Sequence, residues 1–229
     1  MHLKQLMVGI TFLLAYICTL AQNKPDTAVI KNALMDTSSS EGYKALLGRF
    51  NTRPRYLYAY EVSIIYYATL FQKERDQTET QKKINELILE KRFNDVIVIG
   101  EPLLKTSPTN LQLLIALKRA YDETKQEIAT QITNDKLILL RNAITMNGEG
   151  KTEATTLKVA NVQDEDALME MIGIKSISRK SEASISSNIN QWIVTTELLN
   201  DWGYWAIPPT KESKEYKKYD VFIEIIKPR

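Results

Sequence analysis

Histidine and cysteine are nearly missing from this sequence of 229 residues, which contains one of each. The histidine is His2 and the cysteine is Cys18, so both lie in a leader segment that we expect to be removed. A mature chain without imidazole or thiol excludes disulfides, cysteine nucleophiles, histidine bases and Cys/His zinc sites. We therefore expect no catalytic residue, no cofactor and no metal site, and any enzyme would have to use Asp, Glu, Lys, Tyr, Ser or Thr.

The leader is predicted from the first 21 residues. Lys4 forms a short basic region, and the apolar run from Leu6 to Leu20 is too short for a comfortable membrane span. The run ends in Thr19-Leu20-Ala21, which predicts a signal peptide over residues 1–21 and export through the Sec route to the periplasm or the outside of the cell. After cleavage no stable membrane span is expected. A lipid anchor at Cys18 and a retained membrane helix are the alternatives.

A large charge of either sign is also missing. Lys and Arg total 30 against 28 Asp and Glu, so the net charge is +2 and a nucleic-acid partner is not expected. The sequence contains no Ser-x-x-Lys and no Gly-x-Ser-x-Gly, the common signatures of serine hydrolases that work without histidine or with a nucleophile elbow.

Helical periodicity dominates the first two thirds of the chain. Between Lys82 and Asn142 apolar residues recur at spacings of three and four, and Ser107-Pro108-Thr109-Asn110 ends one helix and caps the next. Helix pairs of this size are typical of tetratricopeptide repeats (TPR), although the repeat motif itself is degenerate. We therefore predict a TPR-like region of antiparallel helical hairpins over residues 22–146.

The periodicity changes after Asn147-Gly148-Glu149-Gly150, a strong punctuation signal. The pattern then predicts a helix that begins in the acidic run at Asp164 and stops at Gly173. Strands are predicted at Thr155–Val162, Ile174–Ser178, Gln191–Thr196 and Tyr219–Ile226. The predicted fold class is α+β, with the TPR-like helices followed by a small strand-rich α+β module over residues 147–229.

Two aromatic groups are candidate interaction sites. A helix predicted over Arg55–Gln72 would align Tyr56, Tyr60, Ile64, Tyr67 and Phe71 on one face, which is either core or a binding groove. From it we take Tyr60, Tyr67 and Phe71 as candidate partner anchors. In the second half the candidates form either the core of the small module or a platform for sugars or peptides: Trp192, Trp202, Tyr204 and Trp205.

Asp164, Glu165 and Asp166 form the tightest carboxylate cluster. Two carboxylates at one cleft could hydrolyse a glycoside or hold a hard cation. Adjacent acidic residues point in different directions, however, and a helix start already explains this run. Asn147–Lys151 is interpreted as a connector, because it lacks the ligand pattern of a calcium loop and the upstream glycine of a phosphate loop.

Several segments, in this order, resemble a known family. They are SSSEGYKALLGRF, YYATLFQ at Tyr66–Gln72, KRFNDVIVIGEPLLKTSPTN and NGEGKTEATTLKVANVQDEDALMEMIG, which together span Ser38 to Gly173. The chain resembles the secreted bacterial family called domain of unknown function 4919, found mainly in Bacteroidetes. The resemblance implies a TPR-like helical half joined to a small β-containing half and export from the cytoplasm, and it implies no reaction.

Two functions from different classes follow as hypotheses. The first is an exported, non-enzymatic interaction or scaffold protein of the cell envelope that binds a protein partner. The second is a carbohydrate-binding protein or a carboxylate-dependent hydrolase that acts on envelope or extracellular glycans. A purely structural envelope component cannot be separated from the first by sequence.

Overall fold

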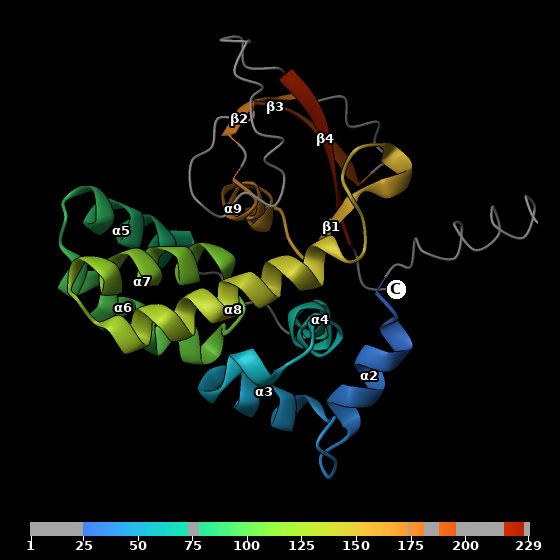
Figure 1. The fold of residues 1–229 in the computed structure, drawn as a ribbon, viewed down its shortest axis with the longest axis horizontal. Coiled ribbons are helices and arrows are strands. Elements are labelled where there is room, and N and C mark those ends of the chain that lie inside the picture. The colour runs from blue at the N-terminus through green and yellow to red at the C-terminus, as the bar shows by residue number, and fades with distance from the viewer. Residues whose placement is uncertain (1–24, 73–77, 174, 181–187, 196–217, 227–229) are drawn as a thin grey trace, which may run out of the picture.

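Helices make up the first part of the chain, and a small sheet with one further helix between its strands makes up the rest, so the predicted α+β class is confirmed (Figure 1). The computed structural model describes residues 25–72, 78–173, 175–180, 188–195 and 218–226. The helices are α2 (Thr27–Met35), α3 (Tyr43–Thr52), η1 (Pro54–Tyr56), α4 (Ala59–Tyr67), η2 (Ala68–Phe71), α5 (Thr78–Leu89), α6 (Phe93–Thr106), α7 (Leu111–Glu123), α8 (Glu127–Thr145), η3 (Glu153–Thr155) and α9 (Gln163–Met171). The strands are β1 (Leu157–Val159), β2 (Lys175–Lys180), β3 (Ile189–Thr195) and β4 (Lys218–Ile225).

Side-chain hydrogen bonds begin the first helix and hold the loop that follows it. Asp26 Oδ1 accepts from the backbone N–H of Ala28 at 2.9 Å and so begins α2. Asp36 accepts from Ser39 and then Ser38, and these bonds hold the pKa of its carboxyl far below the ordinary value. A Cβ at Gly42 would lie 2.2 Å from the carbonyl oxygen of Asp36, so only glycine fits where this loop closes.

The prediction of a single helix over Arg55–Gln72 is wrong. Pro54 opens the short 3₁₀ turn η1, and Leu57 and Tyr58 then take extended backbone conformations. The side chain of Glu61 accepts from the Tyr58 N–H and starts a new helix, α4, at Ala59. The chain therefore forms three short elements here, η1, α4 and η2, in place of one helix.

The helices predicted between Lys82 and Asn142 are present as α5, α6, α7 and α8, and consecutive members contact one another. The predicted stop and restart is confirmed: α6 ends at Thr106, and Asn110 Oδ1 accepts from the Leu113 N–H at 3.0 Å. A Cβ at Gly100 would lie 2.8 Å from Leu117 Cδ2, so this glycine lets α6 approach α7 closely. The likeness of this stack to tetratricopeptide repeats stays a prediction.

The sheet has the strand order β1-β4-β3-β2 over the described residues. β1 pairs in parallel with β4, with Leu157 opposite Ile223, and the pairs β4/β3 and β3/β2 are antiparallel. β1 is shorter than the strand predicted over Thr155–Val162, and all three of its residues are buried. The helix predicted from Asp164 to Gly173 is confirmed as α9, which contacts α7, α8 and β2.

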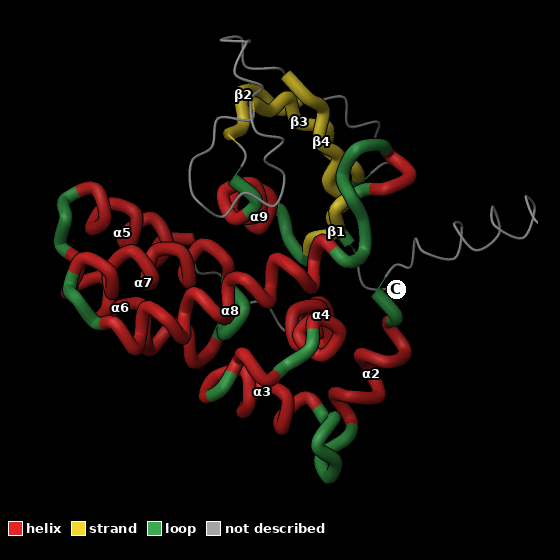
Figure 2. The backbone as a smooth tube through the Cα atoms, in the orientation of Figure 1, coloured by secondary structure: helices red, strands yellow, loops and turns green. Residues whose placement is uncertain are grey.

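The helical part and the sheet share one hydrophobic core. Leu46, Phe50 and Leu140 of the helices belong to the same buried cluster as Leu157 and Leu168. In Figure 2 the sheet lies against one side of the helices, next to α8 and α9. Within the described residues, none of the helices is both long enough and apolar enough to cross a membrane.

Candidate functional site

The aromatic residues of the α4 region lie in two different environments. Tyr66 and Tyr67 are buried, whereas Tyr56, Tyr58 and Tyr60 are exposed. The predicted single face with Tyr56, Tyr60, Ile64, Tyr67 and Phe71 is therefore wrong. Its spacing assumed one continuous helix, but Tyr56 lies in η1 and the last turns of α4 are buried on all sides, since Ile64, Ile65, Tyr66 and Tyr67 are all in the core.

Tyr66 and Tyr67 connect α4 to the second half of the chain. The hydroxyl of Tyr66 donates to Asp164 Oδ2 at 2.6 Å and accepts from the Ala160 N–H at 3.0 Å. The hydroxyl of Tyr67 donates to the carbonyl of Lys158 at 2.8 Å. Burial, and then the Asp164 carboxylate, raises the pKa of Tyr66 well above its ordinary value, and burial also raises the pKa of Tyr67. Both hydroxyls are therefore neutral structural donors.

Tyr67 cannot serve as a partner anchor, because its side chain is 0% exposed. The prediction of this residue as an anchor is wrong, since it assumed the same continuous helix. Phe71 is partly buried against the core, and Lys31 Nζ lies 5.2 Å from the centre of its ring, so part of its surface is already covered. Of the three anchors chosen from this region, Tyr60 alone has the exposure that a direct contact requires.

Tyr56, Tyr58 and Tyr60 are all exposed within five residues of the chain, and we name this group the tyrosine platform. Their exposed fractions are 70%, 70% and 54%. The rings of Tyr58 and Tyr60 are stacked, with centroids 6.0 Å apart and planes 10° apart. Three large aromatic side chains exposed within five residues are unusual on a solvated surface and are typical of binding surfaces.

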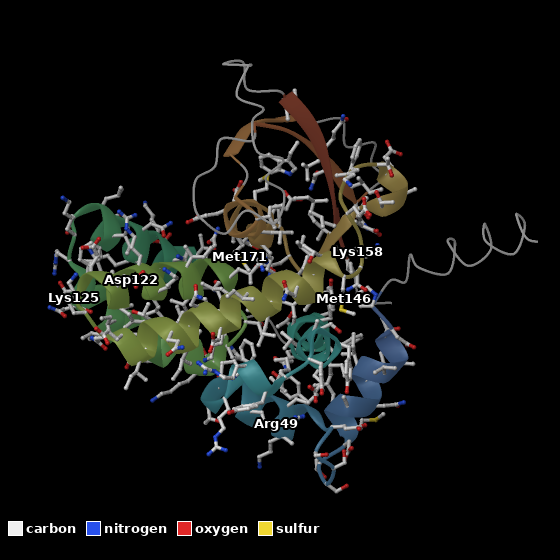
Figure 3. All side chains as sticks on the ribbon, viewed as in Figure 1. Arg49, Asp122, Lys125, Met146, Lys158 and Met171 are labelled. Carbon is white, nitrogen blue, oxygen red and sulfur yellow. The ribbon has the colours of Figure 1, made fainter. Side chains whose placement is uncertain are left out.

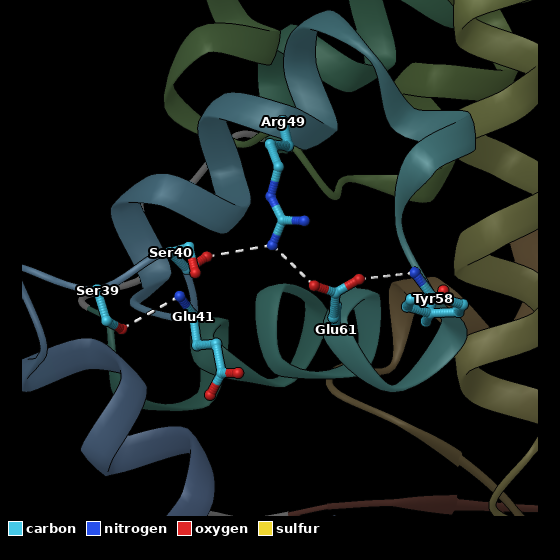
Figure 4. A network of polar contacts seen from close by, with 6 residues as sticks. All are labelled: Ser39, Ser40, Glu41, Arg49, Tyr58 and Glu61. Atoms are coloured by element: carbon cyan, nitrogen blue, oxygen red, sulfur yellow. Dashed lines mark hydrogen bonds and ion pairs between the residues drawn. The ribbon is translucent and has the colours of Figure 1, made fainter.

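A buried carboxylate fixes the backbone under the platform (Figure 4). Glu61 Oε2 accepts from the Tyr58 N–H at 2.8 Å, and Glu61 Oε1 accepts from Arg49 Nη2 at 2.7 Å. The same Arg49 nitrogen donates to the carbonyl of Ser40 at 3.1 Å. Glu61 is buried and accepts from both the Tyr58 N–H and Arg49. The start of α4 is therefore tied to α3 and, through Arg49, to the loop before α3.

Two further sets of contacts fix the backbone of η1 and Leu57, which leads into the platform. Pro54 and Leu57 are buried, and the Leu57 N–H donates to the Pro54 carbonyl at 2.9 Å. Arg55 donates to Asp135 Oδ2 of α8 through Nε at 3.3 Å and through Nη2 at 3.2 Å. The platform is therefore pre-organised, which lowers the conformational entropy lost when a partner binds.

The tryptophan group is placed only in part. Trp192 lies on β3 opposite Val221 and is partly buried against the hydrophobic core. Trp202, Tyr204 and Trp205 lie outside the described residues, so the platform predicted from these four aromatics stays a prediction.

The acidic run does not form an open pair of carboxylates. Asp164 and Glu165 are buried in the first turn of α9, and Asp166 is exposed. Asp164 accepts from Tyr66, whereas Glu165 accepts from the side-chain amide of Asn190 on β3. The helix start predicted from the sequence is present, but the burial of two carboxylates and their distant partners were missed.

A shallow cleft lies at the turn between α7 and α8, with a volume of about 360 Å³. Its lining carries charges of both signs, and Lys118 Nζ forms an ion pair with Asp122 at 2.7 Å. Figure 3 places Asp122 and Lys125 at the end of the helices away from the sheet. Within the described residues no group of three His, Cys, Asp or Glu side chains could hold a metal ion.

A sequence family described as "Domain of unknown function (DUF4919)" matches residues 28–192 of the chain. The match begins in α2 and ends in β3, so it includes the tyrosine platform, the buried tyrosines and α9. No curated protein and no solved structure matches the chain.

Proposed function

The chain belongs to the DUF4919 family, and we propose that it is an exported, non-enzymatic interaction protein that binds a protein partner on the tyrosine platform. The observation that carries this proposal is the exposure of Tyr56, Tyr58 and Tyr60 above a backbone fixed by Glu61. Tyrosine buries a large area at low entropic cost, because it has few rotatable bonds, and it dominates binding energy at protein interfaces.

Export is proposed from the first 21 residues, whose basic start, apolar run and small residues at the end favour signal-peptide cleavage. Cleavage would remove both His2 and Cys18 and leave a mature chain with side chains that hold partners more readily than they catalyse reactions. On the same proposal, the stack of helices α5 to α8 is a TPR-like scaffold that supports the platform and adds binding surface.

Glycan binding remains the second candidate, because exposed aromatic rings also stack on sugars. Hydrolysis by the acidic run has less support, since Asp164 and Glu165 are directed to Tyr66 and Asn190 and the cleft is lined by other residues. A capture experiment separates protein binding from glycan binding if it identifies the bound molecule and also shows whether the tyrosine platform is needed.

We expect the double variant Tyr58→Ala/Tyr60→Ala to lose its protein partner without losing stability. The full-length gene product, tagged at its C-terminus and expressed in its own host, would be captured from the envelope fraction and its companions identified by mass spectrometry. Removing two exposed rings should weaken capture about a hundredfold. The matched control is Leu89→Ala, which removes a side chain that is 82% exposed on α5.

The thermal midpoint of the double variant should stay within about 3 °C of the parent, because the removed side chains make few contacts in the fold. Equal capture by the double variant and the parent would refute the platform as the binding surface. Glycan in place of protein on the captured chain would support the second candidate.

A further inference from the structure

Two arginines, Arg53 and Arg55, precede the tyrosine platform in the chain. Arg53 is exposed, and its guanidinium has no hydrogen bond or ion pair with the described residues. It lies next to the platform, since its carbonyl accepts from the Tyr56 N–H at 3.2 Å. Arg55 is also exposed, with 54% of its side chain accessible, although it donates to Asp135. Two exposed arginines therefore lie directly before Tyr56 in the chain, one at the start of η1 and one within it.

The carboxylates that lie near these cations are already engaged. Glu61 is buried and bonded to Arg49 and to the Tyr58 N–H, and Asp135 accepts from Arg55. Glu41 is exposed, but Figure 4 shows it on the opposite side of the Arg49–Glu61 contact from Tyr58. Lys136 of α8 is buried against Phe50, and its ammonium donates to Asn51. Arg53 is thus an exposed cation beside the platform that no carboxylate of the described residues pairs with.

We infer that the partner presents an acidic peptide segment to the platform, with a carboxylate on Arg53 and apolar or aromatic side chains against Tyr58 and Tyr60. This inference rests on the proposed function and names the chemistry of its partner. A guanidinium binds a carboxylate through two parallel hydrogen bonds, which gives the contact direction as well as energy. Arginine and tyrosine are both enriched among the hot-spot residues of protein interfaces.

The alternative occupant is an anionic glycan, which could use the same cations. We favour a peptide because ligand sites for small polar molecules are concave, and the platform residues do not line the cleft between α7 and α8. Binding of an acidic sugar is therefore an outcome that the experiment must be able to detect.

The test is a selection of random twelve-residue peptides on the immobilised full-length protein. We expect the selected peptides to be enriched in Asp and Glu together with an aromatic residue or proline. Their affinity should fall about tenfold in Arg53→Glu, persist in Arg53→Lys, and weaken as salt is raised. Lys105→Glu is the matched control, because it makes the same charge change at an exposed lysine on α6 and should leave the affinity unchanged.

The outcomes separate the two proposals. Peptides that lose affinity in Tyr58→Ala but bind Arg53→Glu as well as the parent would overturn the acidic partner and leave the platform in place. Peptides whose affinity is unchanged by both substitutions would overturn the platform as the binding surface as well. A failure to enrich any peptide, or retention of acidic oligosaccharides instead, would overturn the acidic-peptide inference.

Discussion

Replacing Tyr67 by alanine is expected to lower the free energy of unfolding by about 4 kcal/mol, because it leaves a large cavity in the core. The ring of Tyr67 is fully buried and lies edge-on to Tyr66 with centroids 4.8 Å apart. Its hydroxyl also donates to the Lys158 carbonyl of β1. Tyr60→Ala, on the same helix, should cost less than about 0.5 kcal/mol, since that side chain is mostly exposed. Urea denaturation followed by circular dichroism measures both.

Tyr67→Phe separates the two causes. It keeps the ring and removes the hydroxyl, so the loss should be about 1 to 2 kcal/mol, which includes the cost of leaving the Lys158 carbonyl without this donor. Similar losses in Tyr60→Ala and Tyr67→Ala would contradict the division of α4 into an exposed start and a buried end.

Lys136→Met is expected to stabilise the protein at pH 7 by up to about 3 kcal/mol, because it removes a buried charge that no carboxylate of the described residues pairs with. Lys136 is 5% exposed, and Nζ donates to Asn51 Oδ1 at 3.2 Å and lies 5.3 Å from the centre of the Phe50 ring. The neighbouring Asp135 is directed to Arg55 instead. Burial lowers the pKa of Lys136 from 10.5 to about 8.

The direction of the pH dependence follows from that shift. The folded state binds the lysine proton more weakly than the unfolded state, so the energetic cost is complete below pH 8 and fades as the pH rises from about 8 to 10.5. The parent should therefore gain stability across this window relative to Lys136→Met, as measured by urea denaturation at each pH. Lys105→Met, which replaces an exposed lysine, should show the same gain in stability between about pH 8 and 10.5 as the parent. A Lys136→Met protein with the parent's pH profile, or with lower stability at pH 7, would contradict a buried unpaired ammonium.

The parts of the fold that could be predicted from sequence depend on local signals. Pro108 and Asn110 mark the boundary between α6 and α7, and Gly173 ends the segment that contains α9, because caps and turns act over a few residues. The parallel pairing of β1 with β4 joins residues more than sixty positions apart, and no local pattern encodes such a partner. For the same reason the contact between Tyr66 and Asp164 was missed.

The candidate site could be predicted only in part. Tyr60 was chosen from a periodicity that assumed one helix, and Tyr58 is not among the residues that this periodicity places on one face. A signal for the break is present in the sequence, since Pro54 opens a turn and Glu61 stands three residues after Tyr58, the spacing at which a glutamate can accept from the backbone N–H before a helix. Together these residues predict a helix start at Ala59, but the exposure of three tyrosines around it also depends on which neighbours cover them.

Nitration of tyrosines in the captured complex tests the central claim most directly, because it reports which rings the partner covers. The isolated protein would be treated with tetranitromethane, alone and after capture of its partner from the envelope fraction, and each tyrosine quantified by peptide mass spectrometry. We predict fast modification of Tyr56, Tyr58 and Tyr60 in the free protein, slow modification of Tyr66 and Tyr67 in both samples, and protection of Tyr58 and Tyr60 in the complex. Unchanged nitration of Tyr58 and Tyr60 in the complex would contradict the platform as the binding surface.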